Sequence, residues 1–218
     1  MARKTYYSYS RLWKYLRDPA EYYRGYVLGM WDPPTDKMVL GSIFAEAFAD
    51  PKFPLEKALI APQKFIRGCP AGISFTPNYR RVIEGVLANE SFLTCAPEEA
   101  EQAIYVEGPL CPLMGKFDGK RESIDLLIEN KFGTPWTEER AHTDDQVAFY
   151  SYIYWLKFNK IPKVLLQTVD RESGRIKKYL VEKTEKDFDP LKEKIELAYN
   201  GIQAKDWTHK ETPYGQYF

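Results

Sequence analysis

Three ionisable residues stand close together near the middle of the chain. Asp118 lies in the segment GKFDG at 115–119, and Glu129 and Lys131 lie in IENKFG at 128–133. The period-two pattern and the polar turn between the segments predict two consecutive strands. Side chains alternate across a strand, so Glu129 and Lys131 share one face. Antiparallel pairing would bring the Asp118 carboxylate beside that of Glu129.

Two carboxylates and an amine in one place have a definite chemistry. Mg²⁺ and Mn²⁺ prefer oxygen ligands and keep several waters, so two acids and a backbone carbonyl suffice when a substrate phosphate supplies the rest. A lysine beside them would orient or deprotonate the attacking water, or neutralise charge developing on the phosphate. The alternatives are structural, since Glu/Lys pairs are common on exposed sheets and Asp before Gly119 is typical of a turn.

Helices are predicted before and after these strands. The first begins at Ser10 as N-cap and ends or turns near Asp18 and Pro19. Proline and glycine make residues 51–80 an irregular connection. The remaining predicted helices cover residues 39–50, 78–92, a buried segment from about Thr143 to 159, and an amphipathic tail helix that begins at Asp189 or Pro190. Strands are predicted at 103–108, 111–120 and 123–133, and in a hairpin over 163–184 that turns at Ser173 and Gly174.

GKFDG followed by IENK resembles the core of the PD-(D/E)XK nuclease superfamily, in which an acid precedes (D/E)-x-K on consecutive strands. Gln146 and Tyr150 are similar to the Q-x-x-x-Y element of its RecB-like and RecE-like exonuclease branch, which includes Cas4-like and phage-type enzymes. Residues four apart share a helix face, so both side chains can point into one site. The resemblance implies a restriction-endonuclease-like α/β fold, a mixed central β-sheet flanked by helices, with an N-terminal helical region.

Two segments of the N-terminal half are also similar to this branch. SYSRLWKYLRDPAEYYRGYV matches its serine-led opening helix, and LGSIFAEAF is similar to its G-x-x-x-H helix. Ala45 stands where the branch places its metal-binding histidine, and Glu46 follows it. Glu46 is a candidate metal ligand, but a one-residue offset rotates it by about 100°. The alternative is a solvent-facing helix acid.

The resemblance assigns roles to the site residues. Asp118 and Glu129 would hold Mg²⁺ or Mn²⁺ with the backbone carbonyl of Asn130, and Lys131 would activate water for in-line attack on a phosphodiester. Gln146 and Tyr150 would support the lysine or the scissile phosphate. An iron–sulfur cluster is not expected, because Asp18 precedes the early proline where iron–sulfur members carry cysteine, and no cysteine follows Cys111.

Contacts with DNA are predicted at four residues. Tyr9, Arg11 and Trp13 belong to an aromatic and basic N-terminal stretch suited to stacking on unpaired bases, and Lys178 belongs to a basic hairpin that would track the DNA backbone. The alternatives are a helical lid packed with core aromatics and a solvated edge strand defended by charge. His142 is left without a role, and Asp125 is interpreted as a surface acid.

Composition sets the wider limits. The 218 residues are 44% hydrophobic, which is enough for one sizeable core. We expect a single domain over 1–218, with a mainly helical region at 1–102, a catalytic core at 103–188 and a C-terminal helix and tail at 189–218. The chain has 31 lysine and arginine residues and 31 aspartate and glutamate residues. This balance excludes an overall positive charge that would bind nucleic acid or anionic membranes nonspecifically. Without an apolar run of about 20 residues or a signal-like start, an intracellular, cytoplasmic protein is expected, in the host cytoplasm if phage-encoded.

The sequence therefore predicts a metal-dependent DNA exonuclease of recombination, repair or phage replication. Its expected partners are linear DNA with a free end, a single-strand annealing protein and further copies of itself. Two alternatives stay open: a noncatalytic DNA-binding or adaptor protein on the same fold, and a structure-specific endonuclease with the same site.

Overall fold

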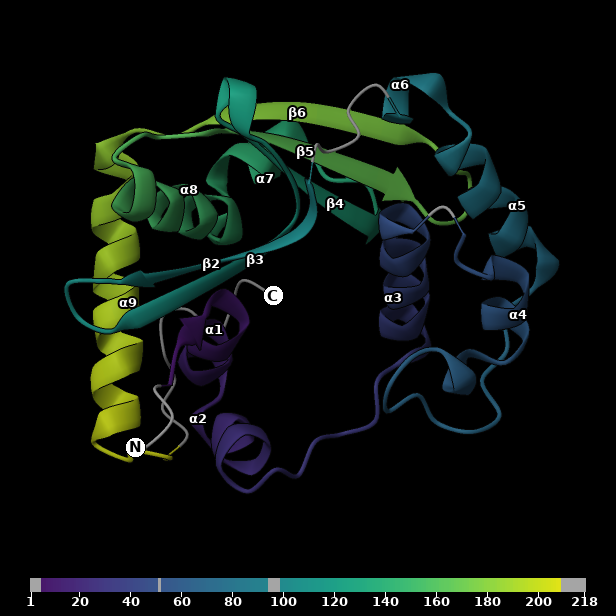
Figure 1. Cartoon of the computed structure of the whole chain (residues 1–218). Helices are drawn as coiled ribbons and strands as arrows, with labels where there is room; N and C mark the ends of the chain where they lie inside the picture. Colours follow the sequence, from purple (N-terminus) through teal and green to yellow (C-terminus); the bar gives the residue numbers. More distant parts are fainter. Residues whose placement is uncertain (1–4, 51, 94–98, 209–218) are drawn as a thin grey trace.

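A computed structural model describes residues 5–50, 52–93 and 99–208. The chain folds around a mixed sheet of six strands (Figure 1). Five of them follow the order β1-β3-β4-β5-β6, and the sixth, β2, also pairs with β3. Two pairings are parallel, β1 with β3 and β4 with β5, and the others are antiparallel. The strands are β1 (Tyr7–Ser8), β2 (Glu99–Glu107), β3 (Pro112–Arg121), β4 (Leu126–Gly133), β5 (Lys163–Asp170) and β6 (Ile176–Glu182).

Helices flank this sheet, as the fold class predicted from the sequence requires. The α-helices are α1 (Tyr9–Arg17), α2 (Pro19–Tyr22), α3 (Asp36–Ala49), α4 (Leu55–Ile60), α5 (Pro77–Leu87), α6 (Glu90–Leu93), α7 (Glu138–Thr143), α8 (Asp145–Phe158) and α9 (Phe188–Gln203). Shorter pieces are a π-helical segment at Tyr23–Val27 and 3₁₀ turns at Pro62–Lys64, Glu122–Ile124 and Glu185–Asp187.

Two hydrophobic cores form on opposite faces of the sheet. Side chains alternate along β4, so Leu127 joins one core while Phe132 packs against the other. The larger core holds α1, α8 and α9 against the sheet, and the smaller one gathers α3 to α6. Phe44 of α3 stacks on Phe132 with ring centroids 4.6 Å apart, which fixes α3 beside the strand that carries Glu129 and Lys131.

The predicted element order holds, and several boundaries move. Ser8 caps α1 instead of Ser10, since its hydroxyl accepts the Arg11 N–H. The predicted irregular segment 51–80 contains α4, and residues 122–124 form a 3₁₀ turn where a strand was expected to begin. The two-residue strand β1 was not predicted, because two residues are too short to show periodicity.

Candidate active site

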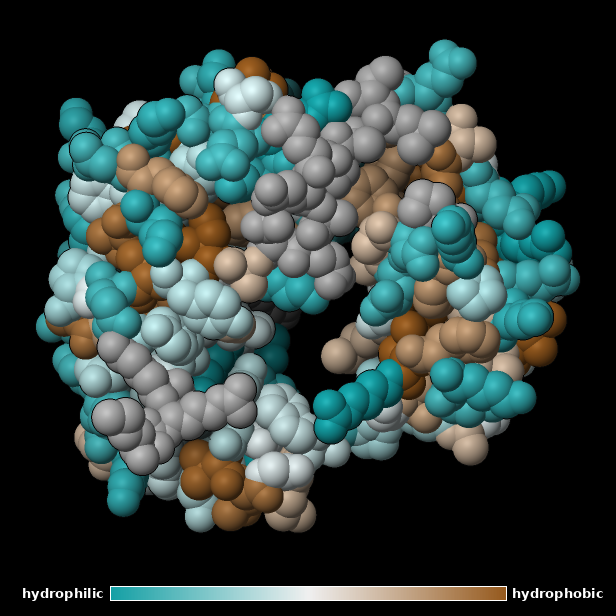
Figure 2. Space-filling view, viewed as in Figure 1, coloured by the Kyte–Doolittle hydropathy of each residue, from teal (hydrophilic) through white to brown (hydrophobic). Residues whose placement is uncertain are grey.

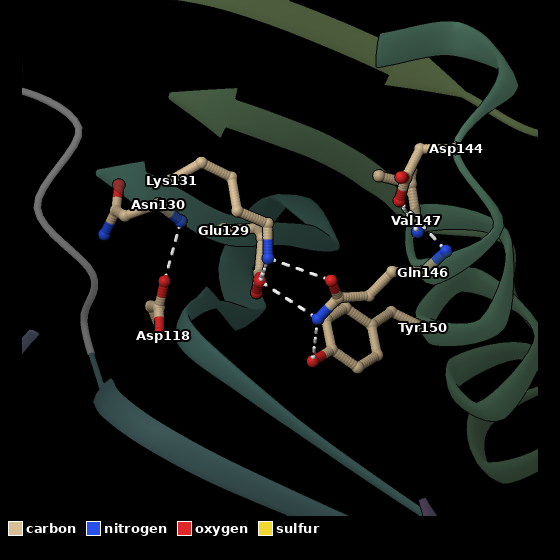
Figure 3. Close-up of polar contacts among 8 residues, drawn as sticks. All are labelled: Asp118, Glu129, Asn130, Lys131, Asp144, Gln146, Val147 and Tyr150. Carbon is tan, nitrogen blue, oxygen red and sulfur yellow. Dashed lines mark hydrogen bonds and ion pairs between the residues drawn. The ribbon is translucent and has the colours of Figure 1, made fainter. Parts of the chain in front are cut away.

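The β3–β4 hairpin brings Asp118 to the strand that carries Glu129. Gly119 pairs with Ile128, so the antiparallel register continued by one residue sets Asp118 opposite Glu129. The Asn130 main-chain N–H donates to Asp118 Oδ2 at 2.7 Å, which holds this carboxylate against β4 (Figure 3). Charge-assisted bonds of this kind are stronger than neutral ones. The structure therefore places the two carboxylates next to each other.

Glu129 and Lys131 point to the same face of β4 and contact each other. Lys131 Nζ lies 2.5 Å from Glu129 Oε1 and also donates to Gln146 Oε1 at 2.9 Å. Glu129 is only 5% exposed, whereas the Lys131 side chain is 26% exposed, so the carboxylate is the more shielded partner of this ion pair. In such surroundings a pair of charges holds its geometry, because breaking it would leave a buried charge without a partner.

Helix α8 supplies the other side of the site. Gln146 Nε2 donates to Glu129 Oε1 at 3.2 Å and to the Tyr150 hydroxyl at 2.7 Å (Figure 3). Gln146 and Tyr150 are one helical turn apart and face β4 together, as the Q-x-x-x-Y spacing predicts. Gly115 of β3 permits this close approach, since a Cβ there would lie 3.3 Å from carbon atoms of Tyr150 and Ile153.

Burial and neighbouring charges shift the ionisation of the central pair. Burial raises the pKa of Glu129 to about 7; the Lys131 ammonium opposes this shift and the Asp118 carboxylate adds to it. Burial alone would lower the pKa of Lys131, but the Glu129 carboxylate outweighs it and the pKa is raised. Lys131 is therefore protonated at neutral pH, while Glu129 lies near its midpoint.

The residues present fit a hard divalent cation. Glu129 Oε2 is buried and has no hydrogen-bond partner among the described residues, which is costly for a carboxylate oxygen. The like charge of Asp118 beside it is also unfavourable without a cation. Carboxylate oxygens are the donors that Mg²⁺ and Mn²⁺ take. Across the described ranges, no group of three His, Cys, Asp or Glu residues could hold a metal ion, so the protein would supply two carboxylates and main-chain oxygen.

Asp144 is a site residue that the sequence reasoning missed. It caps α8, because its Oδ1 accepts the main-chain N–H groups of Gln146 at 2.9 Å and Val147 at 3.1 Å (Figure 3). Burial raises its pKa, which those N–H groups and the Lys131 charge partly offset. Its position before the predicted helix was a signal for a cap, and Thr143 drew the prediction one residue too early.

Within the described part of the chain, no contact joins the Glu46 side chain to these residues. It is exposed on α3, and its carbonyl accepts the Asp50 N–H in the last helical turn. Ala45 beside it is half-buried. The offset from the expected position therefore leaves Glu46 facing solvent, and a metal role for it stays a prediction.

The residues predicted to contact DNA lie in different surroundings. Trp13 is 6% exposed and its indole N–H donates to Asp145 Oδ2 at 3.1 Å, which favours the packing interpretation. Arg11 is held among tyrosine rings and donates to the Tyr22 hydroxyl at 3.0 Å. Tyr9 is half-buried against Trp13 and Phe149, at the end of α1 nearest the site.

The other polar residues singled out lie in other surroundings. Lys178 is half-buried on β6 and lines a polar hollow with Arg175 and Asn89. His142 is exposed, and its carbonyl accepts from Lys183 Nζ at 2.5 Å. Asp125 accepts from the Tyr154 hydroxyl at 2.8 Å and from Lys160 Nζ at 3.0 Å, which makes it a structural residue outside the site.

Comparison with solved structures supports the fold. The chain is similar to the 2.19 Å crystal structure of a "Putative exonuclease" from Eubacterium rectale, with a TM-score of 0.66 and 14% sequence identity. The match covers 92% of this chain and 80% of the other. No protein-family model and no curated protein matches the sequence. Within the described residues, no helix is both long and apolar enough to cross a membrane.

Proposed function

We propose that this protein is a metal-dependent deoxyribonuclease that digests DNA from an end, with Asp118, Glu129 and Lys131 at its centre. One observation carries the proposal: among the described residues, one buried oxygen of Glu129 has no hydrogen-bond partner and lies beside a second carboxylate, while a protonated lysine and Gln146 hold its other oxygen. The two carboxylates would bind a cation, and the neighbouring Lys131 ammonium can donate hydrogen bonds to a phosphate group. The motif order, D then E-x-K then Q-x-x-x-Y, resembles the RecB-like branch of the PD-(D/E)XK nucleases.

The side chains have separate roles in this proposal. Asp118 and Glu129, with the Asn130 carbonyl, would hold Mg²⁺ or Mn²⁺, which supplies charge neutralisation and polarises a phosphoryl oxygen. Lys131 donates hydrogen bonds to the attacking water or to the non-bridging phosphate oxygens where negative charge grows. Gln146 keeps the Lys131 ammonium in place through its Oε1 atom, and Tyr150 fixes the Gln146 amide.

The reaction is hydrolysis of a phosphodiester. A water oxygen forms a bond to phosphorus, the bond from phosphorus to the leaving sugar oxygen breaks, and the water proton passes to solvent while the leaving oxygen gains one. Lys131 enters protonated, so its first task is to stabilise charge and to orient the water. The buried position of Glu129 strengthens these electrostatic interactions.

Digestion from an end is favoured by two resemblances. The motifs are similar to an exonuclease branch, and the structural neighbour is named a "Putative exonuclease". Linear DNA with a free end is then the substrate, and recombination, repair or phage replication is the setting. A single-strand annealing protein or further copies of this chain would act with it.

A second candidate is a noncatalytic DNA-binding protein on the same fold. It is favoured by Ala45, which stands in place of the branch histidine, and by the lack of a third convergent ligand in the described part of the chain. Such a protein would bind DNA without response to Mg²⁺ or Mn²⁺.

The test is a substrate panel. Purified protein is incubated with Mg²⁺ or Mn²⁺ and end-labelled linear duplex, linear single strands or covalently closed circles. The proposal predicts metal-dependent loss of linear DNA and intact circles. Asp118→Asn should be inactive, and Asp125→Asn is the matched control because its carboxylate pairs with Tyr154 and Lys160 outside the site.

Each other outcome selects an alternative. Cleavage of closed circles would replace the exonuclease by an endonuclease that uses the same site. Binding of DNA without cleavage under any condition would support the noncatalytic protein.

A further inference from the structure

The connection between the π-helical segment and α3 exposes an unusual set of apolar side chains. We call residues 28–35 the strap. Three apolar side chains of the strap are exposed: Leu28 (51%), Met30 (61%) and Trp31 (55%). The adjoining Val27 is also 51% exposed. Single exposed apolar residues are normal, whereas exposed apolar residues that gather into a patch mark a binding surface. These exposed residues are therefore a candidate binding surface for a ligand.

The strap also borders an opening in the molecule. In Figure 1 it runs from α2 to α3, along the side of the molecule opposite β6. Figure 2 shows an opening through the molecule between the part that holds α1 and α2 and the part that holds α3, with the strap along its lower edge. A long, flexible ligand that enters this opening would meet the strap.

Trp31 is fixed in place on the strap. Ring atoms of Trp31 lie 2.9 to 3.1 Å from where a Cβ of Gly25 would be, so the indole rests against the Gly25 backbone. Tyr26 packs edge-on against it, with ring centroids 4.7 Å apart, and the ion pair between Arg24 and Asp32 at 2.6 Å holds the next residue. An exposed ring that is already ordered loses little freedom when a ligand stacks on it.

Helix α1 connects the candidate active site with Trp31. Its first residue, Tyr9, packs on Phe149 beside Tyr150. Lys14, five residues later, has its Nζ 5.9 Å from the centre of the Trp31 ring. The axial rise between these two residues of the helix is about 7.5 Å, so α1 links the surroundings of Tyr150 with those of Trp31.

From this geometry we propose that an unpaired nucleic acid strand runs along α1 from the active site to the strap, where Trp31 stacks on one of its bases. The inference rests on the proposed nuclease function, since it concerns the substrate of that site. Bases of every kind offer a flat face to an exposed aromatic ring, and nearby cations attract the backbone. Lys14 lies beside the ring and Arg24 pairs with Asp32 next to it; each cation also holds a carboxylate of the protein, Glu21 and Asp32 respectively. Trp13 cannot take this role, because its ring is buried.

The experiment measures binding without cleavage. A fluorescein-labelled oligothymidylate and a blunt duplex of equal length are titrated with protein in EDTA, and anisotropy gives the dissociation constants. Trp31→Ala should bind the single strand about tenfold more weakly, and Trp31→Phe, which keeps a ring, should remain within about threefold of the wild type. Binding of the duplex should change less. Ile60→Ala, which removes an apolar side chain 65% exposed on α4, is the matched control and should change nothing.

A second variant tests whether the contact between the Trp31 ring and Gly25 is needed for binding. Gly25→Ala places a methyl group against the indole and should weaken single-strand binding while Trp31 remains present. Unchanged single-strand affinity in both Trp31→Ala and Gly25→Ala would overturn the proposal. So would light scattering that shows the wild type as an oligomer and Trp31→Ala as a monomer with unchanged DNA affinity, because the strap would then join two copies.

The outcomes also separate this proposal from the nuclease function. Loss of single-strand binding in Trp31→Ala, with no metal-dependent cleavage by the wild type, would retain the strap as a binding element and reject the nuclease. Cleavage by the wild type, with normal single-strand binding in Trp31→Ala and Gly25→Ala, would retain the nuclease and reject the strap as a binding element.

Discussion

The central residue of the site is Glu129, whose two carboxylate oxygens have different surroundings. Oε1 receives hydrogen bonds from Lys131 and Gln146, while Oε2 is buried without a partner in the described structure. A carboxylate in this position is poorly stabilised unless a cation joins it. The pKa of about 7 expresses this cost, since burial favours the neutral acid.

This shift predicts a pH dependence of stability in EDTA. The pKa of Glu129 is raised in the folded protein, so the folded state binds the proton more tightly. The stabilisation is complete below the unfolded pKa near 4.5 and is lost as the pH rises through about 7. At 1.36 kcal/mol per pKa unit, the wild type should lose up to about 3 kcal/mol of unfolding free energy between pH 5 and 9 relative to Glu129→Gln.

Urea denaturation of both proteins at several pH values measures this difference. Parallel pH profiles for the wild type and Glu129→Gln would show that Glu129 ionises normally. In the wild type Lys131 stays charged in this range, because the Glu129 carboxylate raises its pKa.

At the scale of elements, the start of α8 positions the site. Asp144 binds the first N–H groups of the helix, and Gln146, two residues on, reaches both Lys131 and Glu129. The neighbouring Asp145 pairs with Lys194 of α9 at 2.7 Å and receives the Trp13 indole of α1. Two consecutive acidic residues thus hold the start of α8. Asp144 caps the helix beside the active site, and Asp145 contacts α9 and α1.

Two substitutions of Asp144 distinguish the effect of its N-cap hydrogen bonds from the effect of its charge. Asp144→Ala removes the N-cap and should cost about 1 kcal/mol of stability, whereas Asn is as good a cap as Asp. We expect Asp144→Ala to lower nuclease activity about tenfold through a misplaced Gln146, and Asp144→Asn to keep most of it. Thermal melts and initial cleavage rates check both effects. Equal activity of Asp144→Ala and the wild type would show that the cap does not position Gln146.

Local patterns in the sequence predicted much of this arrangement. The E-x-K spacing on a strand and the four-residue step from Gln146 to Tyr150 fix which side chains share a face, whatever the rest of the fold does. Antiparallel pairing of the two strands was predicted, but the register that sets Asp118 opposite Glu129 depends on the 3₁₀ turn at Glu122–Ile124, part of which was expected to be strand. Ser8 and Asp144 were missed because several polar residues near each helix start compete as caps, and packing of the helix decides between them.

At the scale of the whole molecule, contacts between distant segments escaped prediction. The parallel pairing of β1 with β3 joins residues over 100 positions apart, and local periodicity carries no signal for it. The burial of Trp13 likewise depends on where α8 packs, since its indole donates to Asp145 at the start of that helix. Composition could predict an aromatic N-terminal region, but not which ring remains open to a ligand.

A cation that binds the folded site should stabilise the whole protein. At 100 times the dissociation constant, the linkage gives about 2.7 kcal/mol, which raises the melting temperature by roughly 5 to 10 °C for a chain of this size. Mn²⁺ titrations followed by thermal melting should show this rise in the wild type and none in Asp118→Asn. An equal rise in both proteins would place the cation elsewhere.

The most direct test of the account is the cleavage rate of end-labelled linear DNA by the wild type and by Lys131→Ala, with saturating Mg²⁺ or Mn²⁺. The control is Lys163→Ala, which removes an exposed lysine paired with Glu182 at 2.7 Å on the same sheet. We predict metal-dependent cleavage that falls at least about 100-fold in Lys131→Ala and is unchanged in Lys163→Ala. Cleavage by Lys131→Ala at the wild-type rate, or no cleavage by the wild type with either metal, would contradict the assignment of this site.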